Sequence, residues 1–242
     1  MHTFESLLIW NGIFLVASMI ARYFAGDNFN VKWLAAAFTL FNINVALVLN
    51  IFGLNGLIDS FIGVEDLQFN WAGKVFALAA SLIILASGVI DRGKSGVTFK
   101  QSEQAHWGWG LFILLLILSI IVASFIPDEA HTSEAITYQL TMPSIEEELF
   151  YRGIFLYCLV RAFGDGRSIL WSNFGIAALI STLMFTIIHG IYWSDQGLFV
   201  SIEAILFAGI FGFLLTWLRL NTGSIIAPIL LHSVVNTVWR LL

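Results

Sequence analysis

Ser144-Ile-Glu-Glu-Glu-Leu-Phe-Tyr-Arg-Gly153 is a charged stretch inside an otherwise apolar segment that runs from about residue 135 to 160. It places three consecutive carboxylates and Arg152 within seven residues. A charged side chain at the centre of a bilayer costs roughly 2.5 to 3.5 kcal/mol on insertion scales, so such a stretch must face protein or water. We therefore interpret it first as a functional site.

The composition around this stretch is that of a membrane protein. Of 242 residues, 59% are hydrophobic and 11% are charged, whereas a soluble domain carries about 25% charged residues. Apolar runs of about 20 residues predict transmembrane helices, and the expected fold is an all-α, polytopic membrane helical bundle. The runs predict about eight helices, over residues 6–24, 33–55, 72–90, 107–126, 135–160, 170–189, 197–219 and 223–241.

Charged residues between these helices are sorted by sign. The first, third, fifth and seventh loops are basic, with Arg22, Lys32, Arg92, Lys94, Lys100, Arg161, Arg167 and Arg219. The second, fourth and sixth loops are acidic, with Asp59, Glu65, Asp66, Asp128, Glu129, Glu134 and Asp195, and Lys74 is the only nearby cation. By the positive-inside rule the basic loops are cytoplasmic, which predicts that both termini lie outside.

Several other features narrow the function. No basic patch suited to nucleic acid occurs, so nucleic acid is not an expected partner. The expected partners are the lipid bilayer and a protein or peptide substrate within it. Cys158 is the only cysteine, which excludes an internal disulfide and a CxxC metal site, and we expect it to be a packing residue.

The polar linker 91–106 predicts a division into residues 1–104, with three helices, and a catalytic core over residues 105–242. The amides of the N-terminal helices, at Asn11, Asn42, Asn44 and Asn50, are expected to join helix to helix.

The residues of the charged stretch are predicted to have different roles. Glu148 and Arg152 are four residues apart and share a helix face, so they are predicted to pair. Glu147 would then be left free to act as a general base, while Glu146 faces another side of the helix and is expected to point to a polar loop or lie near water. A salt-bridged structural cluster is the alternative interpretation. Pro143 lacks an N–H, so it is expected to kink this helix and admit water.

Two later helices supply partners of the same kind. Phe185 lies four residues before His189, and His232 lies four residues before Asn236. An imidazole and an amide on one face suit the stabilisation of an oxyanion, although each residue could also be a packing or interfacial group. Trp107, Trp109, Tyr192 and Trp193 are expected to be interfacial anchors, and Tyr192 or Trp193 could also touch substrate.

One Glu, two His and one Asn form a plausible hydrolytic set. Glu147, His189 and His232 are also a possible zinc-ligand set, and the sequence does not decide between the two. The motifs GxSxG, HExxH, GxxxxGK[ST] and GxGxxG are absent, which disfavours serine, zincin and nucleotide-dependent chemistry. Glu203 is a weaker candidate for a residue of the site.

The ordered motifs Glu147-Glu148-xxx-Arg152, Phe185-xxx-His189 and His232-xxx-Asn236 resemble those of the CPBP family. This family comprises CAAX prenyl endopeptidases and bacteriocin-processing or self-immunity proteins, also called the Abi family. Gly153 and the Thr222-Gly223-Ser224 step fit as well, and the resemblance covers roughly residues 105–242.

The resemblance implies an intramembrane endopeptidase in a prokaryotic cytoplasmic membrane. Glu147, helped by His189, would activate water, and His232 and Asn236 would stabilise the oxyanion. Glu148, Arg152 and Phe185 would organise the site. The family has been viewed both as metalloproteases and as glutamate proteases, and the metal-free form is expected here.

Two other classes of function stay open at this level. The chain could be a non-catalytic immunity or scaffold protein of the same fold, or a proton-coupled transporter. The loop charges further predict a site that opens toward the outer half of the membrane, with His189 near the outer face. Such a site would suit an exported or membrane-associated protein substrate.

Overall fold

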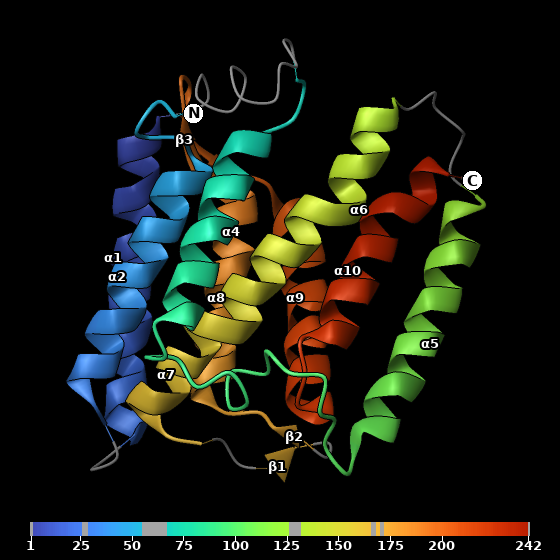
Figure 1. The fold of residues 1–242 in the computed structure, drawn as a ribbon. Helices are drawn as coiled ribbons and strands as arrows, with labels where there is room; N and C mark the ends of the chain where they lie inside the picture. The colour runs from blue at the N-terminus through green and yellow to red at the C-terminus, as the bar shows by residue number, and fades with distance from the viewer. Residues whose placement is uncertain are drawn as a thin grey trace.

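The computed structural model describes residues 2–25, 29–54, 67–125, 132–165, 168–169 and 172–241. These residues form a bundle of helices (Figure 1), which confirms the all-α prediction. The α-helices are α1 (Thr3–Ala25), α2 (Val31–Val48), α4 (Trp71–Ala86), α5 (Ala105–Ala123), α6 (Ser133–Glu147), α7 (Leu156–Phe163), α8 (Ile176–Gly190), α9 (Ile202–Thr222) and α10 (Ile226–Thr237). A π-helix, η2 (Glu148–Phe155), joins α6 to α7, and a 3₁₀ turn, η3 (Val238–Arg240), follows α10.

Four helices of the described chain are long and apolar enough to cross a membrane: α1, α2, α5 and α9. Helices α4, α8 and α10 are apolar but shorter. Apolar side chains point outward along α5, which buries only Ala105, Gly108 and Ala123. Since such a surface suits lipid rather than water, the chain is an integral membrane protein.

Two predicted helices begin later than expected, because short hairpins take their first residues. Strands β1 (Ser168–Ile169) and β2 (Ser172–Asn173) precede α8, and strands β3 (Ile191–Ser194) and β4 (Gly197–Val200) precede α9. Gly197 has φ 99°, a left-handed conformation that glycine adopts without strain. Residues 197–200, predicted as helix, are therefore a strand paired antiparallel with β3.

The long predicted helix over residues 135–160 is a continuous helical rod with an irregular middle. Pro143 lies inside α6, which continues past it, so the departure from α-helical geometry begins at Glu148 rather than at the proline. π-Helical turns are rare and often occur at functional sites. Every residue of η2 is buried, which places the charged stretch at the centre of the bundle.

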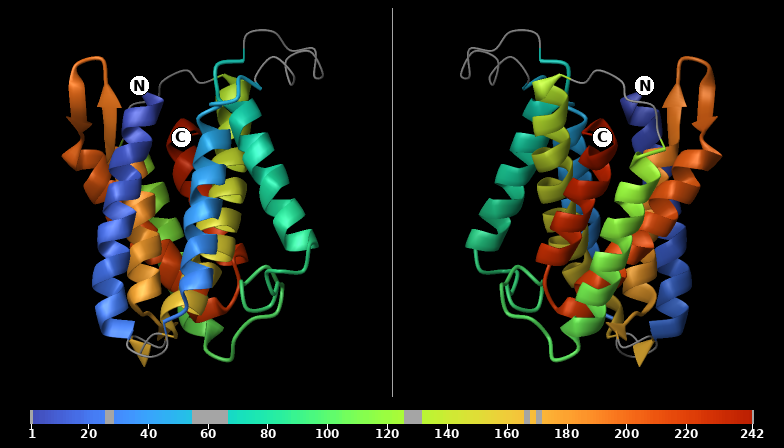
Figure 2. Two further views of the ribbon diagram at one scale, coloured as in Figure 1. Left: turned by 90° about the vertical axis from the view of Figure 1, so that its left-hand side faces the viewer. Right: turned by 90° about the vertical axis from the view of Figure 1, so that its right-hand side faces the viewer.

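The ends of the bundle differ in what they carry. The N-terminus and the β3–β4 hairpin lie at one end, and the linker that follows α4 lies at the other, with β1 and β2 (Figure 1). The hairpin is fixed to α1, because Trp10 Nε1 donates to the Ile191 carbonyl at 2.6 Å. The side views place α4 on the flank away from the hairpin (Figure 2). Several charged residues of the predicted loops lie outside the described residues: Asp59, Glu65, Asp66, Asp128, Glu129 and Arg167.

Amide contacts between helices follow the prediction in part. Asn11 on α1 and Asn42 on α2 exchange two hydrogen bonds, at 2.8 and 2.9 Å. Asn44 also joins two helices, but its partner is a carboxylate of the charged stretch. Cys158 is fully buried and free, as expected of a packing residue.

Candidate functional site

Glu148 and Arg152 form the predicted ion pair at the centre of the bundle. Arg152 Nη1 donates to Glu148 Oε1 at 3.0 Å, and both side chains are fully buried. Arg152 also donates to the Gly212 carbonyl of α9 at 3.2 Å and lies 4.0 Å from the centre of the Phe185 ring. A Cβ at position 212 would lie 2.9 Å from that ring, so glycine lets α9 approach closely enough to receive the guanidinium.

His232 of α10 is bound to the same carboxylate oxygen. Its Nδ1 lies 2.8 Å from Glu148 Oε1, and an ionised carboxylate can only accept, so Nδ1 carries the proton. The ring is 5% exposed and meets Phe211 edge-on, with centroids 5.5 Å apart. Glu148 therefore fixes the orientation and the tautomer of the His232 imidazole.

Lys74 corrects the expectations for Glu146 and Glu147. The sequence left Glu147 without a partner and Glu146 facing a loop or water, but Lys74 is buried in α4 and its Nζ lies 2.7 Å from both Glu146 Oε2 and Glu147 Oε1. Asn44 Nδ2 donates to Glu146 Oε1 at 2.6 Å. Glu146, expected to face loop or water, is thus 1% exposed and fully engaged.

Close packing of α4 on α2 lets Lys74 reach this position. A Cβ at Gly73 would lie 2.5 Å from the Val48 carbonyl oxygen, so a larger residue there would push the two helices apart. The three carboxylates are then opposed by two buried cations rather than by Arg152 alone. The arrangement follows the general rule that buried charges are paired and hydrogen-bonded.

The second oxygen of Glu147 remains available. Oε2 has no hydrogen-bond partner among the described residues and lies 3.8 Å from His189 Nε2. His189 Nδ1 lies 2.6 Å from the Phe185 carbonyl oxygen, which can only accept, so Nδ1–H is the donor. Nε2 is consequently the nitrogen that faces Glu147 and can exchange a proton there.

These side chains meet at a cavity of about 260 Å³, which we call the front cavity. Residues from α6, α8, α9 and α10 line it: Gln139, Pro143, Glu147, Phe185, His189, Phe207, Ala208, Phe211, His232 and Asn236. The predicted residues Glu147, His189, His232 and Asn236 thus converge on one space. Glu148 and Arg152 lie behind its wall and hold His232 in place.

The alternative zinc site, with Glu147, His189 and His232 as ligands, stays a prediction. The Lys74 ammonium occupies one oxygen of Glu147, and a second cation beside it would be repelled. Within the described ranges, no three His, Cys, Asp or Glu side chains are grouped as a metal site would require. We derive no step through a metal.

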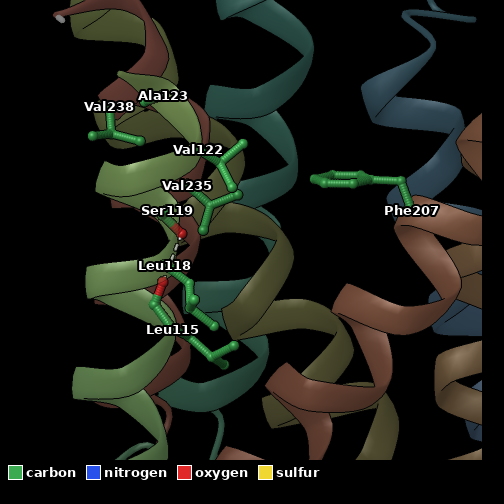
Figure 3. A pocket seen from close by; sticks show the side chains of 8 residues that line it. All are labelled: Leu115, Leu118, Ser119, Val122, Ala123, Phe207, Val235 and Val238. Carbon is green, nitrogen blue, oxygen red and sulfur yellow. Dashed lines mark hydrogen bonds between the residues drawn. The ribbon is translucent and has the colours of Figure 1, made fainter. Parts of the chain in front are cut away.

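An apolar groove of about 400 Å³ shares one lining residue with the front cavity, and Figure 3 shows the side chains that line the groove. It is lined by residues of α5, α9, α10 and η3: Leu115, Leu118, Ser119, Val122, Ala123, Phe207, Val235 and Val238. Phe207 lines both spaces, so the groove leads to the wall of the front cavity.

Other sequence candidates lie away from this site. Glu203 is exposed in the first turn of α9, and Tyr192 and Trp193 are in β3. None of the three lines the front cavity. Tyr192 instead stacks near Phe199 across the hairpin, with centroids 4.8 Å apart.

Residues 130–238 match the model of a family described as type II CAAX prenyl endopeptidase Rce1-like. This region is similar to that family. The match confirms the resemblance found in the sequence, and the family is one of proteases. Searches of curated proteins and of solved structures gave no match.

The Rce1-like region contains every residue predicted for the site, whereas Lys74 and Asn44 lie outside it. The sequence signal for Lys74 was weak but present, because it stands in an apolar run that begins at Trp71 and is followed by twelve uncharged residues. The division of the chain at residue 104 stays a prediction.

Proposed function

We propose that this protein is an intramembrane endopeptidase in which Glu147 activates water against a peptide bond held in the front cavity. The proposal rests on one observation: Glu147, whose Oε2 has no hydrogen-bond partner among the described residues, lines the same cavity as His189, His232 and Asn236. The protease family of residues 130–238 supports the same reaction class.

The first step is removal of a proton from water. Glu147 Oε2 accepts this proton while His189 Nε2, 3.8 Å away, orients the water between them. The water oxygen bonds to the carbonyl carbon of the substrate. Lys74 holds the other oxygen of Glu147 and so directs Oε2 to the reacting atoms.

The second step is stabilisation of the tetrahedral oxyanion. His232, whose Nδ1 donates to Glu148, presents Nε2 as the remaining ring nitrogen, and in the imidazolium form this nitrogen is a donor. The Asn236 amide lies one helical turn further along α10 and supplies a second donor. The proton held by Glu147 then passes to the leaving amine nitrogen as the C–N bond breaks.

A comparison of protein termini tests the proposal. Cells that carry the wild type should contain processed membrane or exported proteins whose termini revert to the unprocessed form when Glu147→Gln replaces it. An identical set of termini in both strains would argue for the non-catalytic alternative. Proton-coupled uptake by the reconstituted protein would instead favour the transporter.

Replacing Lys74 by methionine should lower kcat by about 10²-fold, near the lower end of what a general base contributes. Without the ammonium, Glu146 and Glu147 are adjacent buried carboxylates and repel each other, so one of them binds a proton. Lys74→Arg keeps the charge and should recover part of the activity. Equal activity of the methionine and arginine variants, at equal folded fraction, would refute this role.

The apolar groove supports a substrate that is itself embedded in the membrane. An apolar segment lying against Leu118 and Val235 would bring a neighbouring peptide bond past Phe207 to Glu147. The proposal leaves open whether that segment is a helix or a lipid-modified tail.

Leu118→Trp should fill the groove and raise KM about tenfold with little change in kcat, since it removes binding area without touching the reacting groups. Leu118 is 45% exposed, so the larger ring should not disturb the core. The matched control is Leu8→Trp on α1, which is 58% exposed and outside the groove. The comparison is made with a reconstituted substrate, and equal KM values for the two variants would contradict the groove as a binding surface.

We also propose that the hairpin end of the bundle faces the outer side of the membrane. The basic linker residues Arg92, Lys94 and Lys100 lie at the opposite end, where the positive-inside rule expects the cytoplasm. Asp195, whose side chain is 92% exposed, marks the hairpin tip. Asp195→Cys should react with an impermeant thiol reagent added to intact cells. Cys158 should not contribute to the labelling, because it is buried. Labelling only after the cells are opened would reverse the orientation.

A further inference from the structure

A second cavity, which we call the rear chamber, lies on the other side of Glu147 and His189. Its volume is about 200 Å³. Residues of α1, α2, α4, α6, η2 and α8 line it: Trp10, Asn44, Val45, Val48, Leu49, Lys74, Glu146, Glu147, Tyr151, Ile188 and His189. Glu147 and His189 line both cavities, whereas His232 and Asn236 line only the front one.

The rear chamber contains polar groups that lack a protein partner. The Tyr151 hydroxyl is buried without a hydrogen bond to any described residue, and the same holds for Glu147 Oε2. Tyr151 is 1% exposed. A buried hydroxyl without a partner costs roughly 1 to 3 kcal/mol by protein mutational data, so such groups are normally satisfied by water when protein offers nothing.

Space and polarity together define what the chamber can hold. A water molecule needs about one probe sphere of room and two to four polar partners, and the chamber has space for several. Much of its lining is apolar, with Trp10, Val45, Val48, Leu49 and Ile188, and its polar side is formed by Asn44, Lys74, Glu146, Glu147, Tyr151 and His189. Water is the ligand that this polar side can hold.

We propose that the rear chamber stores the water that hydrolyses the substrate. This inference rests on the proposed proteolytic function. A peptide in the front cavity would block the approach of water past His232 and Asn236, but the rear chamber reaches Glu147 and His189 from behind. Water moves from the chamber to Glu147 Oε2, gives its proton to that oxygen, and bonds to the carbonyl carbon through its own oxygen. The proton leaves with the amine product, so the chamber consumes one water for each bond broken.

The chamber can refill without release of substrate. Val48 and Leu49 belong to the last turn and cap of α2, and His189 belongs to the last turn of α8, which leads directly into β3. These helix ends lie at the hairpin end of the bundle (Figure 1), so the proposal places the entry of water on that side. The front cavity instead adjoins the apolar groove between α5 and α9, so water and substrate arrive from different sides.

Hydroxyl-radical footprinting of the full-length protein in nanodiscs tests for the stored water. Radicals formed from bound water modify nearby side chains even when these are buried, so Tyr151 and Trp10 should be modified. Val48→Phe fills the chamber and should lower the modification of both residues at least fivefold. Val16→Phe, the same change at a position 52% exposed on α1 and away from the chamber, should leave it unchanged. Tyr151 modified equally in all three proteins would overturn the proposal.

Kinetics then test the supply of water. Val48→Phe should lower kcat about tenfold and leave KM unchanged, because substrate binds in the front cavity. If Val48→Phe lowers the radical modification of Tyr151 and Trp10 but leaves kcat unchanged, the chamber does not supply the water for hydrolysis. Footprinting and turnover of the wild type together separate the two hypotheses: modification of Tyr151 in a wild type that cleaves no membrane substrate supports the chamber and rejects the proposed function. Cleavage by the wild type with no modification of Tyr151 rejects the chamber alone.

Discussion

Glu147→Gln should reduce kcat by about 10³-fold or more, within the range that a general base contributes to catalysis. Glutamine has nearly the same shape and can still contact Lys74 through its amide oxygen, but it cannot accept a proton from water. Substrate binding in the front cavity depends on other groups, so KM should change little. Turnover of a reconstituted membrane substrate by purified protein measures both constants.

The control for this variant is Glu203→Gln, the same isosteric change at an exposed position that lines neither cavity. It should retain full activity. Glu147→Gln with wild-type kcat would remove the proposed general base. Wild-type activity that is lost in a chelator and restored by zinc would contradict the metal-free form of the reaction.

Arg152→Leu should destabilise the protein by about 3 to 5 kcal/mol, the cost of removing one partner of a buried ion pair. Glu148 would then remain fully buried with His232 as its only donor among the described residues, and the Gly212 carbonyl and Phe185 ring would lose their cation. The unfolding midpoint in detergent or a steric-trapping assay measures the change.

The double variant Arg152→Leu with Glu148→Leu tests the reason for this loss. With no charge left to bury, it should recover much of the stability and remain inactive, because His232 loses its orienting carboxylate. Arg161→Leu is the control: Arg161 is exposed and lies 5.5 Å from the Trp33 ring, an interaction worth about 0.5 to 1 kcal/mol at such sites. A double variant as unstable as Arg152→Leu would show that packing, not charge, holds this region.

Particular residues show why some of the site was predictable. Glu148 and Arg152 are four apart in the chain, and local helical geometry alone brings such residues into contact. His189 and His232 were predicted as site residues because an ionisable group in an apolar membrane segment is energetically costly and so indicates a functional site. The motif spacing linked them before any contact was known, although the roles assigned to them stay predictions.

Other features were missed for equally physical reasons. The β3–β4 hairpin was hidden because its apolar strand Leu198-Phe199-Val200 runs directly into the apolar α9, so hydropathy alone shows one segment. The π-helix could not be seen either, since α- and π-helical residues have the same composition. Lys74 was counted only as a cation near the acidic loops, because its carboxylate partners lie 72 and 73 positions away in the chain.

The sequence by itself determined that this protein is an α-helical membrane protein, because length and hydropathy fix which segments can cross a bilayer, and it determined which groups are too costly to be filler. Only the tertiary structure decided that Lys74 of α4 occupies one oxygen of Glu147, that Glu148 orients His232, and that Glu147 and His189 separate two cavities. These contacts join residues 73 and 84 positions apart in the chain. Such pairings depend on how whole helices pack, which local patterns of residues do not encode.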